Sequence, residues 1–255
     1  LPLAGLASLW LASAWLAGCQ APPTLSLPPA GSYAAGELLV SLENPDGAEA
    51  RLREAGTEPR TLLGEGLWLV DVPAGTEADA LRRLESLPGV RFAEVNRMLK
   101  TQMVGGFRPA AGSAGYDVAA TVNDPKYRPP SGTTLPGQWG LDQIKAPTAW
   151  DTTQGGVLVA VIDTGVDSNH EDLSANLDMG KAANFVEPGK PPFDDFGHGT
   201  HVAGIIGAVA NNGVGIAGVA PKVTIMPVRV LGVDGGTTAA LIQGIDHAVA
   251  KGAKV

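Results

Sequence analysis

The chain has 255 residues, with 18 Lys and Arg against 26 Asp and Glu, so its formal net charge is −8. This acidic balance argues against a nucleic-acid-binding protein, which should carry a basic patch. Hydrophobic residues make up 44% of the chain and charged residues 17%, which excludes a disordered chain and is sufficient for a packed core. The one cysteine excludes an internal disulfide and a cysteine-based zinc site.

The first 18 residues carry no charge, and Cys19 and a proline-rich stretch follow them. Such a segment is a short membrane span or a secretory signal peptide, and its interrupting Ala, Gly and Ser residues favour the signal peptide. Residues 16–19 (LAGC) resemble a bacterial lipobox, whose cysteine is acylated. The resemblance implies a lipidated Cys19 and an exported protein, extracellular or lipid-anchored to the membrane of the bacterial cell envelope. The alternative is an ordinary secretory signal with an incidental cysteine.

Residues 1–19 are thus expected to be a signal peptide and residues 20–35 a linker. From residue 36 onward, strand-type and helix-favouring segments alternate. In chain order they predict a strand, a helix, a strand hairpin, a helix and a strand, over residues 36–42, 46–55, 62–72, 76–87 and 90–99. Thr76 is the predicted N-cap of the second helix. We expect a small α+β, ferredoxin-like unit over residues 36–100, which by itself is a structural or binding domain.

Residues 101–122 are rich in Gly and Ala and predict a linker with a processing site. A second domain is expected over residues 123–255. Its apolar, β-branched run at 157–162 (VLVAVI) predicts a strand buried on both faces, as in a parallel sheet. The strand ends at Asp163, and active sites of open α/β sheets lie at such strand ends. The alternative is an ordinary turn or helix-capping aspartate.

Residues 198–212 (HGTHVAGIIGAVANN) predict a helix that is apolar on most sides and therefore buried. His198 stands at its N-terminal edge, where the positive end of the helix disfavours an imidazolium unless a carboxylate compensates. A buried aspartate that hydrogen-bonds one ring nitrogen fixes the tautomer and leaves the other nitrogen free as a base. Asp163 is the candidate for that carboxylate.

Four long motifs follow one another in the second domain: VIDTGVDSNHEDL, HGTHVAGIIGAV, NNGVGIAGVAP and VRVLGVDGG. In this order they resemble the subtilisin-like serine proteases (subtilases), in a thermitase-like form. The resemblance implies an α/β fold with a parallel sheet and flanking helices, incomplete in this chain, behind a unit similar to subtilase propeptides. It also implies a precursor of an endopeptidase that hydrolyses protein or peptide substrates, with Asp163 orienting His198 and His198 as general base.

The family places its serine nucleophile and its oxyanion-hole asparagine further along the chain. No serine follows His198 in the sequence, and residues 251–255 (KGAKV) resemble the start of the strand that leads to the asparagine. We therefore expect a precursor truncated before the catalytic serine, inactive in this form. In the longer protein we expect the propeptide to occupy the active-site cleft and self-cleavage to fall between residues 98 and 122.

The resemblance further implies a structural calcium ion, and carboxylates with amide and backbone oxygens suit such a hard cation. The implied ligands are Asp124, Asp172, the Asn212 side chain and the carbonyls of Val209, Val214 and Ile216. The alternative is that the two aspartates are solvated turn residues.

The resemblance also places a substrate-binding edge at Gly235, Gly236 and Thr237, where an extended peptide would pair through main-chain hydrogen bonds. Glycines there are also ordinary loop residues.

Two further hypotheses remain open from the sequence. The first reads His198, His201, His170 and the nearby aspartates as a catalytic metal site, although the spacing lacks the HExxH pattern of metalloproteases. The second is a catalytically dead homologue that binds peptides, or a propeptide module that only inhibits. His247 is expected to be a helix-face residue, and His170 and His201 to have structural roles.

Overall fold

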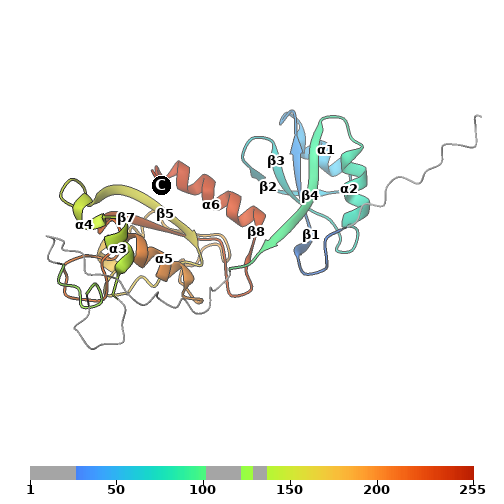
Figure 1. Cartoon of the computed structure of the whole chain (residues 1–255). Helices are drawn as coiled ribbons and strands as arrows, with labels where there is room; N and C mark the ends of the chain where they lie inside the picture. The colour runs from blue at the N-terminus through green and yellow to red at the C-terminus, as the bar shows by residue number, and fades with distance from the viewer. Residues whose placement is uncertain (1–26, 102–121, 129–136) are drawn as a thin grey trace, which may run out of the picture.

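The computed structural model describes residues 27–101, 122–128 and 137–255. In the first range, strands and helices alternate in the predicted order (Figure 1). The elements are β1 (Tyr33–Leu42), α1 (Ala48–Glu54), β2 (Glu58–Leu63), β3 (Leu67–Asp71), α2 (Glu77–Glu85) and β4 (Val90–Leu99). The strands pair antiparallel in the order β2-β3-β1-β4, which is the ferredoxin-like arrangement. Strand β1 begins at Tyr33, so the linker expected over residues 20–35 is too long at its C-terminal end.

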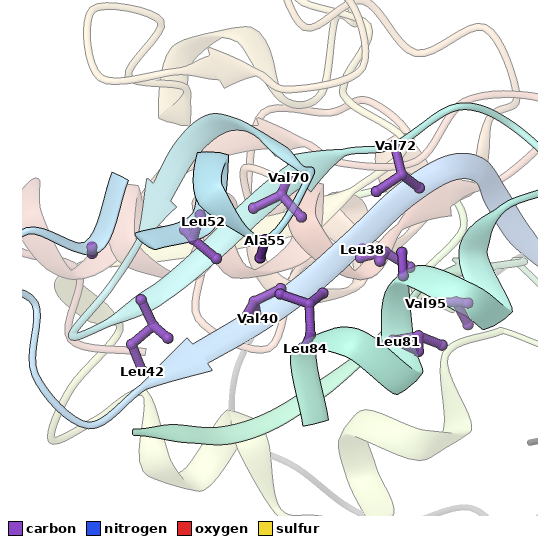
Figure 2. Close-up of a cluster of buried hydrophobic side chains, with 12 residues drawn as sticks. Leu38, Val40, Leu42, Leu52, Ala55, Val70, Val72, Leu81, Leu84 and Val95 are labelled. Atoms are coloured by element: carbon purple, nitrogen blue, oxygen red, sulfur yellow. The ribbon is translucent and has the colours of Figure 1, made fainter. Parts of the chain in front are cut away.

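Strand β1 contains an uninterrupted apolar run, LLV, and other parts of the chain cover both of its faces. Leu38 and Val40 are fully buried in one cluster with Leu84 of α2, as Figure 2 shows. Leu39 is also buried, but it belongs to a different cluster that includes Ala239 from the second part of the chain. Side chains alternate between the two faces of a strand, so an apolar residue at every position requires a packed layer on each side.

Helix α2 follows the predicted amphipathic pattern but not the predicted cap. Ala80, Leu81 and Leu84 are buried on the face that meets the sheet. Thr76 does occupy the N-cap position, yet its hydroxyl donates to the carbonyl oxygen of Pro73 at 2.7 Å and does not cap the helix. A threonine hydroxyl can bond either to a carbonyl oxygen of the preceding turn or to an N–H group of the helix, and here it bonds to the turn.

The second part of the chain contains a parallel sheet with the strand order β5-β7-β6. Asp163 of β5 and Asn184 of β6 are both in register with Arg229 of β7, so the carboxyl ends of the strands meet at one edge. The elements are α3 (Trp139–Gln143), α4 (Ala146–Ala149), β5 (Gly155–Asp163), the 3₁₀ helix η1 (Ser174–Asn176), β6 (Ala183–Asn184), α5 (His198–Gly207), β7 (Lys222–Arg229), β8 (Gly236–Thr237) and α6 (Thr238–Ala250).

Helices pack on both faces of this parallel sheet. Val159 of β5 is buried in a cluster with Ala203 of α5, whereas Val228 of β7 is buried in a cluster that includes residues of α6. The prediction of full burial is wrong at two places, because Val157 is 41% exposed and Ile205 is 48% exposed. A helix on the outside of a sheet presents only one stripe to it, so Ile205 remains on the outer side of α5.

The last residues of the chain lie beside β5. The N–H of Ala160 donates to the carbonyl oxygen of Val255 at 2.8 Å, and the N–H of Lys254 donates to that of Leu158 at 2.8 Å. These two bonds place residues 254 and 255 beside β5, but the structure assigns no strand to residues 251–255, so the strand start expected for KGAKV is not seen.

The two parts of the chain meet where β4 reaches β8 (Figure 1). Met98 and Leu99 pair antiparallel with Thr237 and Gly236, respectively. Gly235 makes this approach possible, because its φ is +98° and a Cβ atom there would lie 2.1 Å from the carbonyl oxygen of Leu99. Any larger residue at position 235 would push the two segments apart.

Candidate active site

Two of the predicted site residues meet at the carboxyl edge of the parallel sheet. Asp163 ends β5, and His198 begins α5 directly after Gly197, whose φ is +93°. The Nδ1 atom of His198 lies 2.7 Å from Oδ1 and 2.9 Å from Oδ2 of Asp163. The Asp163 side chain is 13% exposed and the His198 side chain 30% exposed. The carboxylate is thus largely shielded, while the imidazole remains accessible.

This geometry suits an imidazole that transfers protons. A carboxylate beside Nδ1 keeps the proton on that nitrogen, so the lone pair of the neutral ring lies on Nε2. The same carboxylate stabilises the imidazolium that forms when Nε2 accepts a proton. Asp163 is itself held in place, since its Oδ1 accepts the N–H of Thr164 at 2.7 Å.

Asp194, which the sequence analysis did not single out, fixes the start of α5. Its Oδ1 accepts the N–H of Gly197 at 2.7 Å, and its Oδ2 accepts the N–H and hydroxyl of Thr200 at 2.8 and 2.6 Å. The hydroxyl of Thr164 donates to Oδ1 of Asp194 at 2.8 Å and accepts the N–H of Gly199 at 2.8 Å. The network therefore links the residue that follows Asp163 to the residue that follows the candidate histidine.

The environment of Asp194 keeps it ionised. Burial by itself would raise its pKa, but hydrogen bonds from Thr200, Gly197 and Thr164 outweigh burial and hold the pKa below the ordinary value of 3.8. The resulting negative charge lies at the N-terminus of α5, where the helix dipole favours it. An acidic residue just before a helix start is the sequence signal for such a role. Asp195 carries the same signal, so the sequence alone does not choose between them.

The predicted substrate-binding edge is occupied by the first domain. Gly236 and Thr237 form β8 and pair with β4, while Gly235 lines the cleft that continues from this pairing. The cleft has a volume of about 190 Å³. It is lined by Lys100, Thr101, Phe196 and residues 232–235. The segment after β4 therefore leads toward the loop that carries His198.

The two predicted calcium-binding carboxylates are buried, with Asp124 2% and Asp172 1% exposed, so they are not solvated turn residues. Asp124 accepts the N–H groups of Asn211 and Asn212 at 2.9 and 3.1 Å. Asp172 accepts hydrogen bonds from Nδ2 of Asn212 at 2.8 Å and from the N–H of Ile216 at 2.9 Å. Both carboxylates thus hold the same loop.

The other predicted ligands on this loop also contact the cluster through N–H groups. The N–H of Val209 donates to the carbonyl oxygen of Asp172 at 2.9 Å, and the N–H of Val214 donates to Oδ1 of Asn212 at 2.8 Å. Two buried carboxylates and an amide oxygen are an oxygen-only donor set that fits a hard cation. In the part of the chain that the structure describes, no three His, Cys, Asp or Glu side chains gather as they would around a metal ion.

The remaining histidines have local contacts. His170 accepts the N–H of Asp172 on Nδ1 at 3.2 Å. His201 is exposed on α5. His247 of α6 lies with Nε2 2.7 Å from the carbonyl oxygen of Lys181 and packs edge-on against Phe185, with 5.8 Å between ring centroids. The contacts of His170 and His247 are those of structural residues, whereas the exposed position of His201 does not support a packing role for it.

Comparison with known proteins relates both parts of the chain to one protease family. Residues 154–255 match the subtilase family, and residues 20–96 match the fervidolysin N-terminal prodomain. The chain is 46% identical to thermitase from Thermoactinomyces vulgaris over 137 residues, which are 53% of this chain and 46% of thermitase. It is 34% identical to the thermophilic serine proteinase of Bacillus sp. (strain AK1) over 233 residues, which are 88% of this chain and 51% of that protein.

Among solved structures, fervidolysin from Fervidobacterium pennivorans shares the fold. It is described as a keratinolytic enzyme related to subtilisin, and it matches with a TM-score of 0.58 at 23% identity over 89% of this chain and 36% of fervidolysin. The chain spans about half the length of the curated relatives named above. The matches confirm the predicted resemblance to subtilases and the predicted fold: residues 154–255 match the subtilase family, and they lie behind a region, residues 20–96, that matches the fervidolysin N-terminal prodomain.

Proposed function

We propose that this chain supplies the aspartate and the histidine of an Asp-His-Ser endopeptidase that is made as a precursor. The contact between Nδ1 of His198 and both carboxylate oxygens of Asp163, at 2.7 and 2.9 Å, carries the proposal. No serine follows His198 in the sequence, so the proposal takes the nucleophile and the oxyanion-stabilising asparagine from sequence outside these 255 residues. The 255-residue chain on its own is then inactive.

In the proposed reaction, Nε2 of His198 accepts the proton of the serine hydroxyl as the serine oxygen attacks the scissile carbonyl carbon. The imidazolium is stabilised by Asp163 and then donates its proton to the leaving amine as the C–N bond breaks. Water then attacks the carbonyl carbon of the acyl-enzyme in the same way, with His198 again accepting and donating the proton. This step releases the carboxylic acid and restores the serine. Asp194 and Thr164 act as positioning residues for this pair through the α5 network.

The prodomain is proposed to act as an intramolecular inhibitor. The pairing of Leu99 with Gly236 supports this, because β4 occupies the edge that would pair with an extended substrate. Lys100 and Thr101, which follow β4, line the cleft together with Phe196. Most of the range proposed for self-cleavage, residues 102–121, lies outside the described residues; a cut directly after Thr101 would leave the new C-terminus of the prodomain at this cleft.

The test uses the whole reading frame that contains this chain. The protein expressed from this reading frame should react with a fluorophosphonate serine probe and should cleave itself between residues 98 and 122. His198→Ala should abolish both reactions, whereas His201→Ala, the exposed histidine on the same helix, should retain them. Cleavage at the same position in His198→Ala would assign processing to another protease. Absence of labelling in the wild type would favour the alternative, a dead homologue that binds peptides.

We also propose a structural calcium ion held by Asp124, Asp172 and Asn212, with the carbonyls of Val209, Val214 and Ile216. Calcium at 100 times its dissociation constant should stabilise the folded chain by about 2.7 kcal/mol. Thermal unfolding with calcium and with EDTA measures this shift. Asp172→Asn should remove the shift, whereas Glu171→Gln, at the exposed neighbouring position, should keep it. A calcium effect of equal size in both variants would contradict this site.

Export and lipidation of Cys19 are proposed from the sequence of residues 1–19, which lie outside the described residues. No helix in the described ranges is long and apolar enough to span a membrane. Expression in a bacterium with labelled palmitate should label the wild type and not Cys19→Ser. An unlabelled, secreted wild type would support the ordinary signal peptide instead.

A further inference from the structure

Arg229, the last residue of β7, is a buried cation between two segments of the cleft. Its side chain is only 5% exposed. A buried guanidinium loses its hydration, so it is stable only where several acceptors surround it. Its position in register with Asp163 places it at the carboxyl edge of the sheet, next to the candidate active site.

One side of the Arg229 guanidinium holds the loop that precedes His198. Its Nη1 donates to the carbonyl oxygen of Phe193 at 2.9 Å, and its Nη2 donates to Oδ2 of Asp195 at 2.8 Å. Glu187 adds a second acidic partner, with 3.6 Å between Nη1 and Oε2. Because Phe196 directly follows Asp195, these bonds fix the chain next to Phe196, which lines the cleft.

The other side of the guanidinium holds the glycine-rich edge. Its Nε donates to the carbonyl oxygen of Leu231 at 3.4 Å. A Cβ atom added at Gly232 would lie 3.5 Å from Nη2, so the edge passes directly over the guanidinium. Gly232 is the first residue of the 232–235 segment, which lines the same cleft as Phe196.

We propose that Arg229 is a positioning residue that sets the spacing between the two walls of the cleft for an extended peptide. One planar group bonds to both segments, and a guanidinium fork can do this where a single ammonium cannot. The identity of the occupant as a peptide substrate rests on the proposed function; in this chain Lys100 and Thr101, which follow β4, form part of the cleft lining. Asp194, which lies between Phe193 and Asp195, holds the start of α5 through hydrogen bonds of its own, from Gly197 and Thr200.

Amide hydrogen exchange of the whole 255-residue chain tests this role without requiring catalysis. Arg229→Lys keeps the positive charge but replaces the forked guanidinium by a single ammonium group. Amides in residues 98–101 and 232–237 should therefore exchange at least about 10-fold faster. Amides at 164–166, beside Asp163, should stay within about twofold of the wild-type rate. The control Arg82→Lys changes a guanidinium that pairs with Asp79 on the exposed face of α2 and should leave residues 232–237 unchanged.

Arg229→Met removes all of the hydrogen bonds and should accelerate exchange at the cleft further. If Arg229→Met does not fold, Arg229→Lys decides the question. Unchanged exchange at 232–237 in Arg229→Lys, or an equal acceleration throughout the chain, would overturn the positioning role.

On the longer protein, Arg229→Lys should raise KM for an extended peptide about 10-fold and change kcat by less than about twofold. A fall in kcat at constant KM would also overturn the proposal. If no serine probe reacts with the wild type, the proposed function fails, and the exchange result still decides the role of Arg229.

Discussion

Replacing Asn96 by Ala should uncouple the prodomain from the subtilase segment. Asn96 is completely buried on β4. Its Oδ1 accepts the N–H of Ala239, in the first turn of α6, at 3.0 Å, and its Nδ2 donates to Oε2 of Glu37 at 2.7 Å. The start of α6 therefore has one cap in its own segment, the Thr237 hydroxyl, and one in the prodomain.

The structure gives the size of the effect. Each lost hydrogen bond costs about 1 kcal/mol, and the buried N–H of Ala239 would lose its acceptor at a further cost of about 1–3 kcal/mol. Because these terms overlap, Asn96→Ala should destabilise the chain by about 2–4 kcal/mol, or about 30- to 1000-fold in the unfolding equilibrium.

Urea unfolding of the whole chain measures this loss, and amide exchange at Ala239 locates it. Asn44→Ala is the matched control, because the Asn44 side chain is exposed and accepts a local N–H from Asp46; this substitution should cost less than about 1 kcal/mol. In Asn96→Asp the acceptor for Ala239 remains, but a second carboxylate faces Glu37, so its stability should recover when one of the two carboxyl groups is protonated. A loss below about 0.5 kcal/mol in Asn96→Ala, with Ala239 still protected, would refute the reasoning.

In Asp194→Asn, the free energy of unfolding should fall less than in the wild type as the pH is lowered. The pKa of Asp194 lies below its ordinary value of 3.8 in the folded chain, so the unfolded chain binds more protons and stability is lost as the pH falls below 3.8 through the folded pKa. Thermal unfolding from about pH 7 to pH 2 measures this, and equal acid loss in wild type and variant would contradict it. Gly235→Ala should release the end of β4, because its Cβ would lie 2.1 Å from the Leu99 carbonyl oxygen, so trypsin should cut after Lys100 at least about 10-fold faster. Gly189→Ala also has a positive φ, +87°, but no neighbour within 4 Å, and equal cutting in both variants would show that the contact is not the cause.

Local patterns were sufficient to predict the ferredoxin-like prodomain. The helical spacing of Ala80, Leu81 and Leu84 and the short apolar runs around it are set by residues that are neighbours in the chain. The LLV run of β1 predicted a strand, but not that its second leucine would face another domain. A hydrophobic pattern records that a side chain is buried and does not record which element covers it.

The sequence predicted the long-range contact of Asp163 with His198, but not the other long-range polar contacts. Asp194 and Asp195 are adjacent and chemically identical, yet one bonds the start of α5 and the other bonds Arg229. Asn96 lies in a strand where most polar residues face solvent, and its partner Ala239 is 143 positions away. These roles depend on the positions that folding gives to distant backbone N–H groups, and residue type alone does not carry that information.

The contacts of the prodomain with the subtilase segment concentrate on one short stretch, so its release should be cooperative. Gly236 pairs with β4, Ala239 receives the Asn96 cap, and Ile242 packs beside the buried leucines of the prodomain. Those leucines are Leu39, Leu63 and Leu69. Exposing one buried leucine costs about 2 kcal/mol, so separation of the domains costs several times the free energy of one strand hydrogen bond. A peptide that competes only for the β8 edge does not offset this cost. If the prodomain inhibits as proposed, cleavage of the segment after β4 would free the cleft only when the leucine cluster also separates from α6.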